Sequence, residues 1–346
     1  METRKVQRLG PSTLAMTLPA EWTREHDVEK GQEVALRTGE KGTLTVLPES
    51  VDTEHTEATL RTAGLDADAL ERAILAQYVL GRRVINVEGG EGALDSAHIN
   101  AVYRAESQLM GLGVIEETPE AIAIRCSVDP EDFSLDNLLQ RLENTGSTMR
   151  TEGTKALARG DPDLAERALN RERQANKIFV LLLRLIFSAY RNPNLLRAVG
   201  LESGFPLIGY RSVAKNLELI ADNAEDIAET VLATEELAVD RETLRRIREF
   251  SDQVDELTEQ AVAAVVDRDY AATVAVREGF SEVTDREAEI LADLPEMDNE
   301  SLLRVRELLV SLQETAQYAM RIAEVAANIS LNEENEHVSI TSSLDD

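Results

Sequence analysis

One stretch, residues 211–232, separates apolar and acidic residues onto different faces of a single helix. Its apolar residues recur at helical spacing: Leu217, Ile220, Ala224, Ile227 and Val231. Its acidic residues form a second row: Glu218, Asp222, Glu225 and Glu229. Because each residue turns the helix by roughly 100°, the two rows point in different directions. The helix is therefore expected to pack through one face, and the acidic row has two interpretations, a solvated surface or a cation site.

The composition describes an acidic globular chain. The 346 residues are enough for about two or three domains of roughly 100–200 residues each. There are 65 acidic residues against 36 basic ones, for a net charge of −29, and the basic residues divide into 30 Arg and 6 Lys. Dispersed acidic charge with little Lys is typical of adaptation to a high-salt cytoplasm, where a short Debye length screens self-repulsion. The alternative is an ordinary acidic protein.

The sequence predicts a cytoplasmic protein without a membrane span. The single cysteine, Cys126, lies in an apolar alternation, and we expect a buried strand residue in a reducing compartment. The most apolar run, residues 178–187, is about half the ~20 residues that a membrane span needs, and it contains Arg184. That run is predicted to be a core helix.

No motif in the sequence predicts an enzyme. We find no triad spacing, Gly-rich phosphate loop or metal-hydrolase motif. A pair of carboxylates without a general base, nucleophile or pocket does not define an active site. We therefore assign no catalytic residue.

The predicted fold class is multidomain α+β. The expected order is a small β domain with a hairpin turn at residues 39–42, a small α/β module, two tandem three-helix bundles and an acidic tail expected to be disordered. These parts are assigned to residues 1–50, 51–128, 129–234, 235–332 and 333–346.

The helical half repeats its own plan. In the first half, Gly160 is expected to end one helix, Asp161-Pro162 to begin the next, and residues 200–209 to connect to the third. The last helix of each half aligns on Ile-Ala-Glu, at residues 227–229 and 322–324, an offset of 95. The repeat predicts two similar bundles side by side.

The N-terminal residues differ in charge from the rest of the chain. Residues 1–24 carry a net charge of +2, with four basic residues against Glu2 and Glu21. Loop residues 10–13 follow the basic run and could present backbone N–H groups and hydroxyls to phosphate. A nucleic-acid interface and a solvated strand edge both fit this pattern. A domain of about fifty residues buries little by itself, which favours dimerisation.

The segment RKVQRLGPSTLAMTLPAEWTREHDVEKGQEVAL resembles the SpoVT/AbrB swapped-hairpin DNA-binding domain in its archaeal form. The resemblance covers about 45 residues and implies an intertwined homodimer whose paired N-terminal strands and loops face DNA. By position, it implies that Trp22 packs in the dimer core. It also implies six DNA-contacting residues: Arg4, Lys5, Arg8, Ser12, Thr13 and Arg24.

The tandem helical half resembles the PhoU family, carried mainly by LELIADNAEDIAE at residues 217–229. Members of this family bind metal through an E/D-x-x-x-D motif, because carboxylates at i and i+4 share a helix face. The motif implies Glu218 and Asp222 as ligands of a divalent metal or iron, with Glu172 on the facing helix. In the second repeat Gln313 and Gln317 replace the acids, so a metal is expected in the first repeat alone.

With both resemblances, the chain is similar to a haloarchaeal-type phosphate-uptake regulator that has an AbrB-like domain ahead of PhoU repeats. They imply a homodimer that binds DNA and senses phosphate status, in contact with the ATPase of a phosphate ABC transporter or another signalling protein. The alternative is a dimeric adaptor that does not bind DNA and represses the transporter by protein contact.

Overall fold

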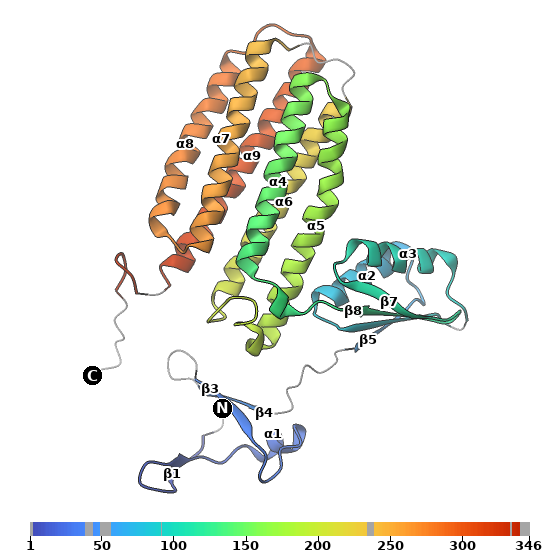
Figure 1. Ribbon diagram of the computed structural model, residues 1–346, viewed down its shortest axis with the longest axis vertical. Helices are drawn as coiled ribbons and strands as arrows, with labels where there is room; N and C mark the ends of the chain where they lie inside the picture. The colour runs from blue at the N-terminus through green and yellow to red at the C-terminus, as the bar shows by residue number, and fades with distance from the viewer. Residues whose placement is uncertain are drawn as a thin grey trace. The chain divides into compact units, whose positions relative to one another are not determined.

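The computed structural model describes residues 3–38, 44–48, 57–90, 92–233, 239–332 and 334–339, and the chain divides into two compact units, residues 1–56 and 57–346 (Figure 1). The turn predicted at residues 39–42 lies outside the described residues. So does most of the tail predicted to be disordered, residues 340–346.

The N-terminal unit consists of two hairpins and a short helix. Strand β1 (Gln7–Arg8) pairs antiparallel with β2 (Leu14–Ala15), α1 spans Ala20–Glu25, and β3 (Val34–Thr38) pairs antiparallel with β4 (Leu44–Pro48). None of the side chains described in this unit is buried. Its exposed large apolar residues are Val6, Leu9, Leu14, Met16, Leu36 and Leu44. One copy of the unit therefore forms no closed core from its described residues.

The second unit begins with an α/β module. Its elements are β5 (Glu57–Arg61), α2 (Ala67–Val79), β6 (Val84–Glu88), α3 (Ser96–Gln108), β7 (Leu112–Glu117) and β8 (Ala121–Cys126). The sheet order is β5-β6-β8-β7, with β5 and β6 parallel and the other pairs antiparallel. Helices α2 and α3 cover one face (Figure 1), and Cys126 is buried in β8 as predicted.

Long helices make up the rest of this unit. They are α4 (Leu135–Arg159), α5 (Pro162–Arg191), α6 (Pro206–Leu232), α7 (Arg241–Val266), α8 (Tyr270–Ala292) and α9 (Asn299–Ser330). Gly160 ends α4 in the left-handed conformation, with φ of 60°, and the Asp161 side chain caps α5, as predicted. None of the described helices is both long and apolar enough to cross a membrane.

Helix α6 begins earlier than its sequence pattern predicts. The connection was expected to run through residue 209, but Pro206 lies in the first turn of α6, where its missing N–H costs nothing. Gly209 then lies inside the helix because α9 passes close to it. A Cβ at Gly209 would stand 2.9 Å from Cδ1 of Ile329. Tertiary packing therefore explains a glycine that the sequence suggests is a loop residue.

Helices α4, α5 and α6 form one group of three, and α7, α8 and α9 form a second group that packs antiparallel to the first. Helix α4 packs against α7 and α6 against α9. The start of α6 meets the end of α9 at Gly209, and in the middle of α6 the Asn223 amide donates to the carbonyl of Ser311 at 3.3 Å. The apolar core runs continuously through both groups.

Two arginine side chains of α5 bind the α/β module. The Arg184 guanidinium lies over the Tyr78 ring, 4.8 Å from its centroid, and donates to the carbonyls of Tyr78 at 2.6 Å and Arg82 at 3.1 Å. Arg191 donates to the Leu80 carbonyl at 2.7 Å. These acceptors lie at the C-terminal end of α2, the negative end of its dipole, so the two arginines place positive charge where the helix dipole favours it.

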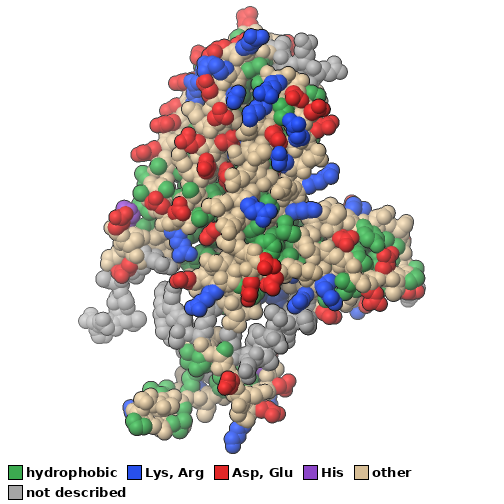
Figure 2. All heavy atoms as spheres, viewed as in Figure 1, with side chains coloured by type: hydrophobic (Ala, Val, Ile, Leu, Met, Phe, Trp, Pro, Cys, Tyr) green, Lys and Arg blue, Asp and Glu red, His purple; other side chains and the backbone are tan. Residues whose placement is uncertain are grey.

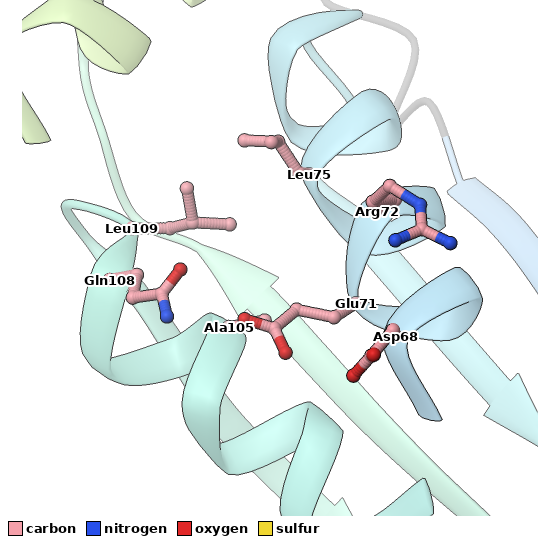
Figure 3. A pocket seen from close by; sticks show the side chains of 7 residues that line it. All are labelled: Asp68, Glu71, Arg72, Leu75, Ala105, Gln108 and Leu109. Carbon is pink, nitrogen blue, oxygen red and sulfur yellow. The ribbon is translucent and has the colours of Figure 1, made fainter. Parts of the chain in front are cut away.

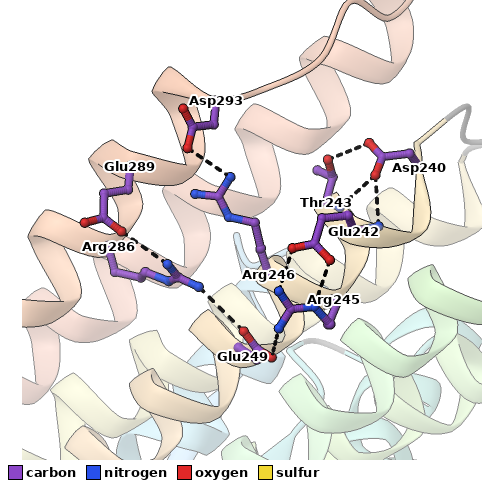
Figure 4. Close-up of polar contacts among 9 residues, drawn as sticks. All are labelled: Asp240, Glu242, Thr243, Arg245, Arg246, Glu249, Arg286, Glu289 and Asp293. Atoms are coloured by element: carbon purple, nitrogen blue, oxygen red, sulfur yellow. Dashed lines mark hydrogen bonds and ion pairs between the residues drawn. The ribbon is translucent and has the colours of Figure 1, made fainter.

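Ion pairs on the surface link α7 to α8 (Figure 4). Arg286 of α8 reaches Glu249 of α7 at 3.5 Å, and Arg246 of α7 reaches Asp293 just after α8 at 3.3 Å. Arg245 pairs with two glutamates of its own helix. Pairs exposed in this way contribute about 0–1 kcal/mol each, so the apolar core holds these helices together and the ion pairs add to it.

Candidate functional site

A cluster of carboxylates lies between α5 and α6. Glu172 of α5 faces three members of the acidic row of α6, which are Glu218, Asp222 and Glu225. All four side chains are half-buried, because α5 packs alongside the acidic face of α6. Glu229 of the same row is exposed. The structure thus brings the predicted ligand residues together, in a setting less solvated than an open helix face.

Burial and mutual repulsion disfavour ionisation in this cluster. Burial, with the neighbouring charge of Glu218, raises the pKa of Asp222 to about 6. The pKa values of Glu172 and Glu225 are raised as well, mainly by burial and then by the neighbouring carboxylates. Asp222 is therefore expected to take up a proton between about pH 5 and 7, and the cluster should attract cationic groups more strongly once Asp222 is ionised.

A cation of the protein itself already occupies the cluster. The Lys215 ammonium donates to the Glu218 carboxylate and lies 5.7 Å from the centroid of the Phe179 ring on α5. Lys215 was not among the residues singled out from sequence. The signals that could have identified it are its spacing of three residues from Glu218 and the rarity of Lys in this chain.

The residues do not fit a ready metal centre. Within the part of the chain that the structure describes, no group of three or more His, Cys, Asp or Glu side chains is arranged to hold a metal ion. On the facing helix the motif position next to Glu172 is Asn176, which is exposed. In the second repeat Gln313 donates to the Thr284 hydroxyl at 3.1 Å. Metal binding by Glu172, Glu218 and Asp222 therefore stays a prediction.

A second charged cluster lies buried where α4 meets α7. Arg150 is fully buried and pairs with Asp255, with Nε at 2.7 Å and Nη2 at 2.5 Å from Oδ1. Its Nη1 has no hydrogen-bond partner. Glu143, 5% exposed, lies close enough that Arg150, Asp255 and Glu259 all influence it. Burial is the largest cause, and it raises the pKa of Glu143 to about 7.

The six predicted DNA-contacting residues are all exposed. Arg8, Ser12 and Thr13 meet at the β1–β2 hairpin, whose loop is closed by a hydrogen bond from Leu9 N to the Thr13 carbonyl at 3.0 Å. Two of the arginines also bind backbone carbonyls, Arg8 that of Pro11 at 2.8 Å and Arg24 that of Ala20 at 3.0 Å. Arg4 and Lys5 precede β1, and Arg24 lies on α1. The hairpin therefore gathers three of the six.

Trp22, predicted to pack in a dimer core, is half-buried in the single chain. Its ring contacts that of His26, with centroids 5.2 Å apart.

A hollow of about 250 Å³ lies elsewhere, between α2 and α3 (Figure 3). Two acidic residues that line the hollow already have a partner in the protein, because Arg104 binds Glu71 at 2.7 Å and approaches Asp68 at 3.6 Å. Arg72 points away from the space between the helices. On the face drawn in Figure 2, acidic and basic side chains are interspersed over the long helices. Neither feature adds a reactive group to the carboxylate cluster.

Two family models match the chain. The PhoU domain matches residues 139–231, which span most of α4 through α6 and contain the carboxylate cluster. The model described as antidote-toxin recognition MazE, bacterial antitoxin, matches residues 7–53. One chain thus carries a PhoU match in its helical part and a MazE match in its N-terminal unit.

Two solved structures that align with the chain are those of PhoU proteins. The phosphate transport system regulatory protein PhoU from Streptococcus pneumoniae aligns with 16% identity and a TM-score of 0.49, over 57% of this chain and 94% of that one. PhoU from Pseudomonas aeruginosa aligns with 17% identity and a TM-score of 0.42, over 56% and 94%. No curated protein matches the chain.

Proposed function

We propose that this protein is a regulator of phosphate uptake that binds DNA as a homodimer through residues 1–50 and responds to phosphate status through its helical half. The observation that carries the proposal is the presence, in one chain, of a PhoU match over residues 139–231 and a MazE match over residues 7–53. The first supports a role in phosphate regulation. The second supports an interface with DNA.

The N-terminal unit supports dimerisation on physical grounds. It buries none of its described side chains and leaves six large apolar ones exposed. Two copies that share one core would cover such residues, and they would also double the basic charge along the paired hairpins. Arg8, Ser12 and Thr13 would then face DNA twice in each dimer, at related positions.

A gel-shift experiment tests the proposal. The protein should shift DNA from a phosphate-transporter promoter, and Arg4→Ala/Arg8→Ala should abolish the shift, while Arg159→Ala, at an exposed position on α4, should leave it intact. The titration is run at several salt concentrations, because counterion release weakens phosphate contacts steeply. An equal shift by all three proteins would refute the proposed interface.

One observation favours the second candidate, a dimeric adaptor that represses a phosphate transporter by protein contact. Arg8 and Arg24 both bind backbone carbonyls, which leaves fewer of their donors for phosphate. The adaptor predicts a dimer by sedimentation and no shift of promoter DNA at any salt concentration. The regulator predicts both the dimer and the shift.

A further inference from the structure

The two edges of the sheet in the α/β module differ in how open they are to further pairing. At the β7 edge, the Glu106 carboxylate accepts a hydrogen bond from the Val114 N–H at 3.1 Å, and the pairing with β8 shifts register between Val114 and Glu116. A bulge, or a side chain bound to an edge N–H, hinders pairing with another strand. At the opposite edge, β5 pairs with β6 in regular register along its whole length, and among the described residues it shows neither feature.

The backbone of β5 presents hydrogen-bonding groups along its outer side. The Thr62 N–H, just after β5, donates to the Glu88 carbonyl of β6 at 3.0 Å. The N–H and C=O groups of successive strand residues point to opposite sides, so the odd-numbered residues of β5 face away from β6. These residues are Glu57, Thr59 and Arg61. Among the described residues, none of the three donates or accepts a backbone hydrogen bond on this outer side.

The outer side of β5 is complementary to itself. A second β5, antiparallel and related by a twofold axis, would place Thr59 opposite Thr59 and Glu57 opposite Arg61 on each side of the axis. Each pair would exchange two hydrogen bonds, so every outward backbone group would gain a partner. Thr–Thr pairs and pairs of opposite charge are among those that stabilise antiparallel strands. We infer that β5 pairs with β5 of a second copy of the chain and joins the two sheets into one.

The side chains of β5 fit this pairing on both faces of the sheet. The Arg61 side chain is 76% exposed and lies 3.9 Å from Glu88, a long contact that leaves it able to reach Glu57 of the second copy. On the face that α2 and α3 cover (Figure 1), Ala58 and Leu60 are half-buried. The pairing would place Leu60 beside Ala58 of the second copy and cover apolar surface that the single chain leaves open.

A second copy of the chain is the partner best placed to supply the opposing strand. The connection from Pro48 of the N-terminal unit to Glu57 spans at most about 32 Å when fully extended. In a dimer held through residues 1–50, a tether this short gives an effective concentration on the order of 1 mM. Two short edge strands bury less surface than the interfaces that hold free chains together, so the contact adds to the dimer. It rests on the homodimer of the proposed function and not on DNA binding.

Cysteine cross-linking of the full chain tests the pairing. Cys126 is the single cysteine and is buried, so Thr59→Cys supplies one exposed thiol. Residues opposed in this way lie about 5.5 Å apart between Cα atoms, within the range of a disulfide. We expect mild oxidation to link most of the Thr59→Cys protein into dimers on a denaturing gel. Glu116→Cys, exposed on β7, would lie roughly 34 Å from its copy and should not be linked.

Charge exchange tests the register of the two strands. Arg61→Glu or Glu57→Arg, each combined with Thr59→Cys, sets like charges opposite each other twice and should reduce the cross-linking about fivefold or more. Arg125→Glu, at an exposed position on β8, should leave it unchanged. Co-expression of the Arg61→Glu and Glu57→Arg chains, one with a longer tag, should restore cross-linking in mixed dimers, because there each pair again joins opposite charges.

Hydrogen exchange distinguishes strand pairing from a dimer held through residues 1–50 alone. In the wild type, the outward N–H groups of β5 should be protected. Thr59→Pro should remove this protection with an unchanged circular dichroism spectrum, because the Thr59 N–H takes no part in the pairing with β6.

Three results would overturn the inference: fast exchange of the outward N–H groups in a wild-type dimer, equal cross-linking by Thr59→Cys and Glu116→Cys, or no recovery in mixed dimers. Arg4→Ala/Arg8→Ala should leave the cross-linking of Thr59→Cys unchanged. A protein that is linked through residue 59 but does not shift promoter DNA would therefore refute the DNA-binding proposal and support this contact.

Discussion

Glu143 gives the most quantitative prediction, because it is a carboxyl group buried beside a charged pair. Burial raises the pKa of this carboxyl group from its ordinary value of 4.5 to about 7 in the folded protein. The folded state therefore binds more protons than the unfolded state between these values, and stability falls as pH rises from about 4.5 to about 7. The difference corresponds to about 3 kcal/mol of unfolding free energy, at about 1.4 kcal/mol per pH unit, lost by about pH 8.

Glu143→Gln removes this titration while keeping the side chain's size. We expect equal stability of wild type and variant near pH 4.5, and a variant more stable by about 2–3 kcal/mol at pH 8, measured by urea unfolding followed by circular dichroism. Asp222 titrates in the same direction in both proteins, so the difference between them isolates Glu143. Glu314→Gln serves as the control for loss of one exposed charge. Parallel stability curves for wild type and Glu143→Gln would refute the account of this interface.

Three further predictions follow from the other contacts. Asp255→Ala leaves the buried Arg150 guanidinium without its carboxylate and should lower the free energy of unfolding by about 3–5 kcal/mol, measured by urea unfolding. Arg150→Met/Asp255→Leu should regain most of that free energy. A double variant whose loss equals the sum of the losses of the two single variants would contradict this. Elemental analysis of protein purified without chelator should find less than one Mn, Fe, Zn or Mg per chain. The metal content should rise in Lys215→Met, which removes the ammonium from the cluster, and fall again when Glu218→Gln is added. Stoichiometric metal in the wild type that is lost on Glu218→Gln would instead establish the predicted site. Raising NaCl from 0.15 to 2 M should increase the thermal midpoint, because screening relieves repulsion in a chain of net charge −29, and a midpoint that does not rise would exclude the high-salt interpretation.

Local signals predicted the helices well, because their ends are determined by neighbouring residues. Gly160, Asp161 and Pro162 end one helix and begin the next through backbone effects that act within a few residues. The predicted start of α6 was wrong. Gly209 lies inside the helix because Ile329, 120 residues away in sequence, packs too close to leave room for a Cβ. A pattern along one helix carries no information about that neighbour.

The candidate site was predictable in composition but not in environment. Glu218 and Asp222 share a helix face by spacing alone, yet their half-buried state depends on α5. The buried pair of Arg150 and Asp255 joins residues 105 apart, and no periodicity in the sequence connects them. The exposure of the Tyr190 and Ile208 side chains could not be predicted either, because it depends on which helix faces the fold leaves uncovered.

Genome-wide mapping of the DNA that this chain binds in cells is the decisive test of the proposed regulator of phosphate uptake. Cells are compared at high and low phosphate, with the wild type and with Arg4→Ala/Arg8→Ala. We predict enrichment at phosphate-transporter promoters that changes with phosphate and disappears in the variant. An absence of enrichment at both phosphate levels would contradict the claim and favour the adaptor.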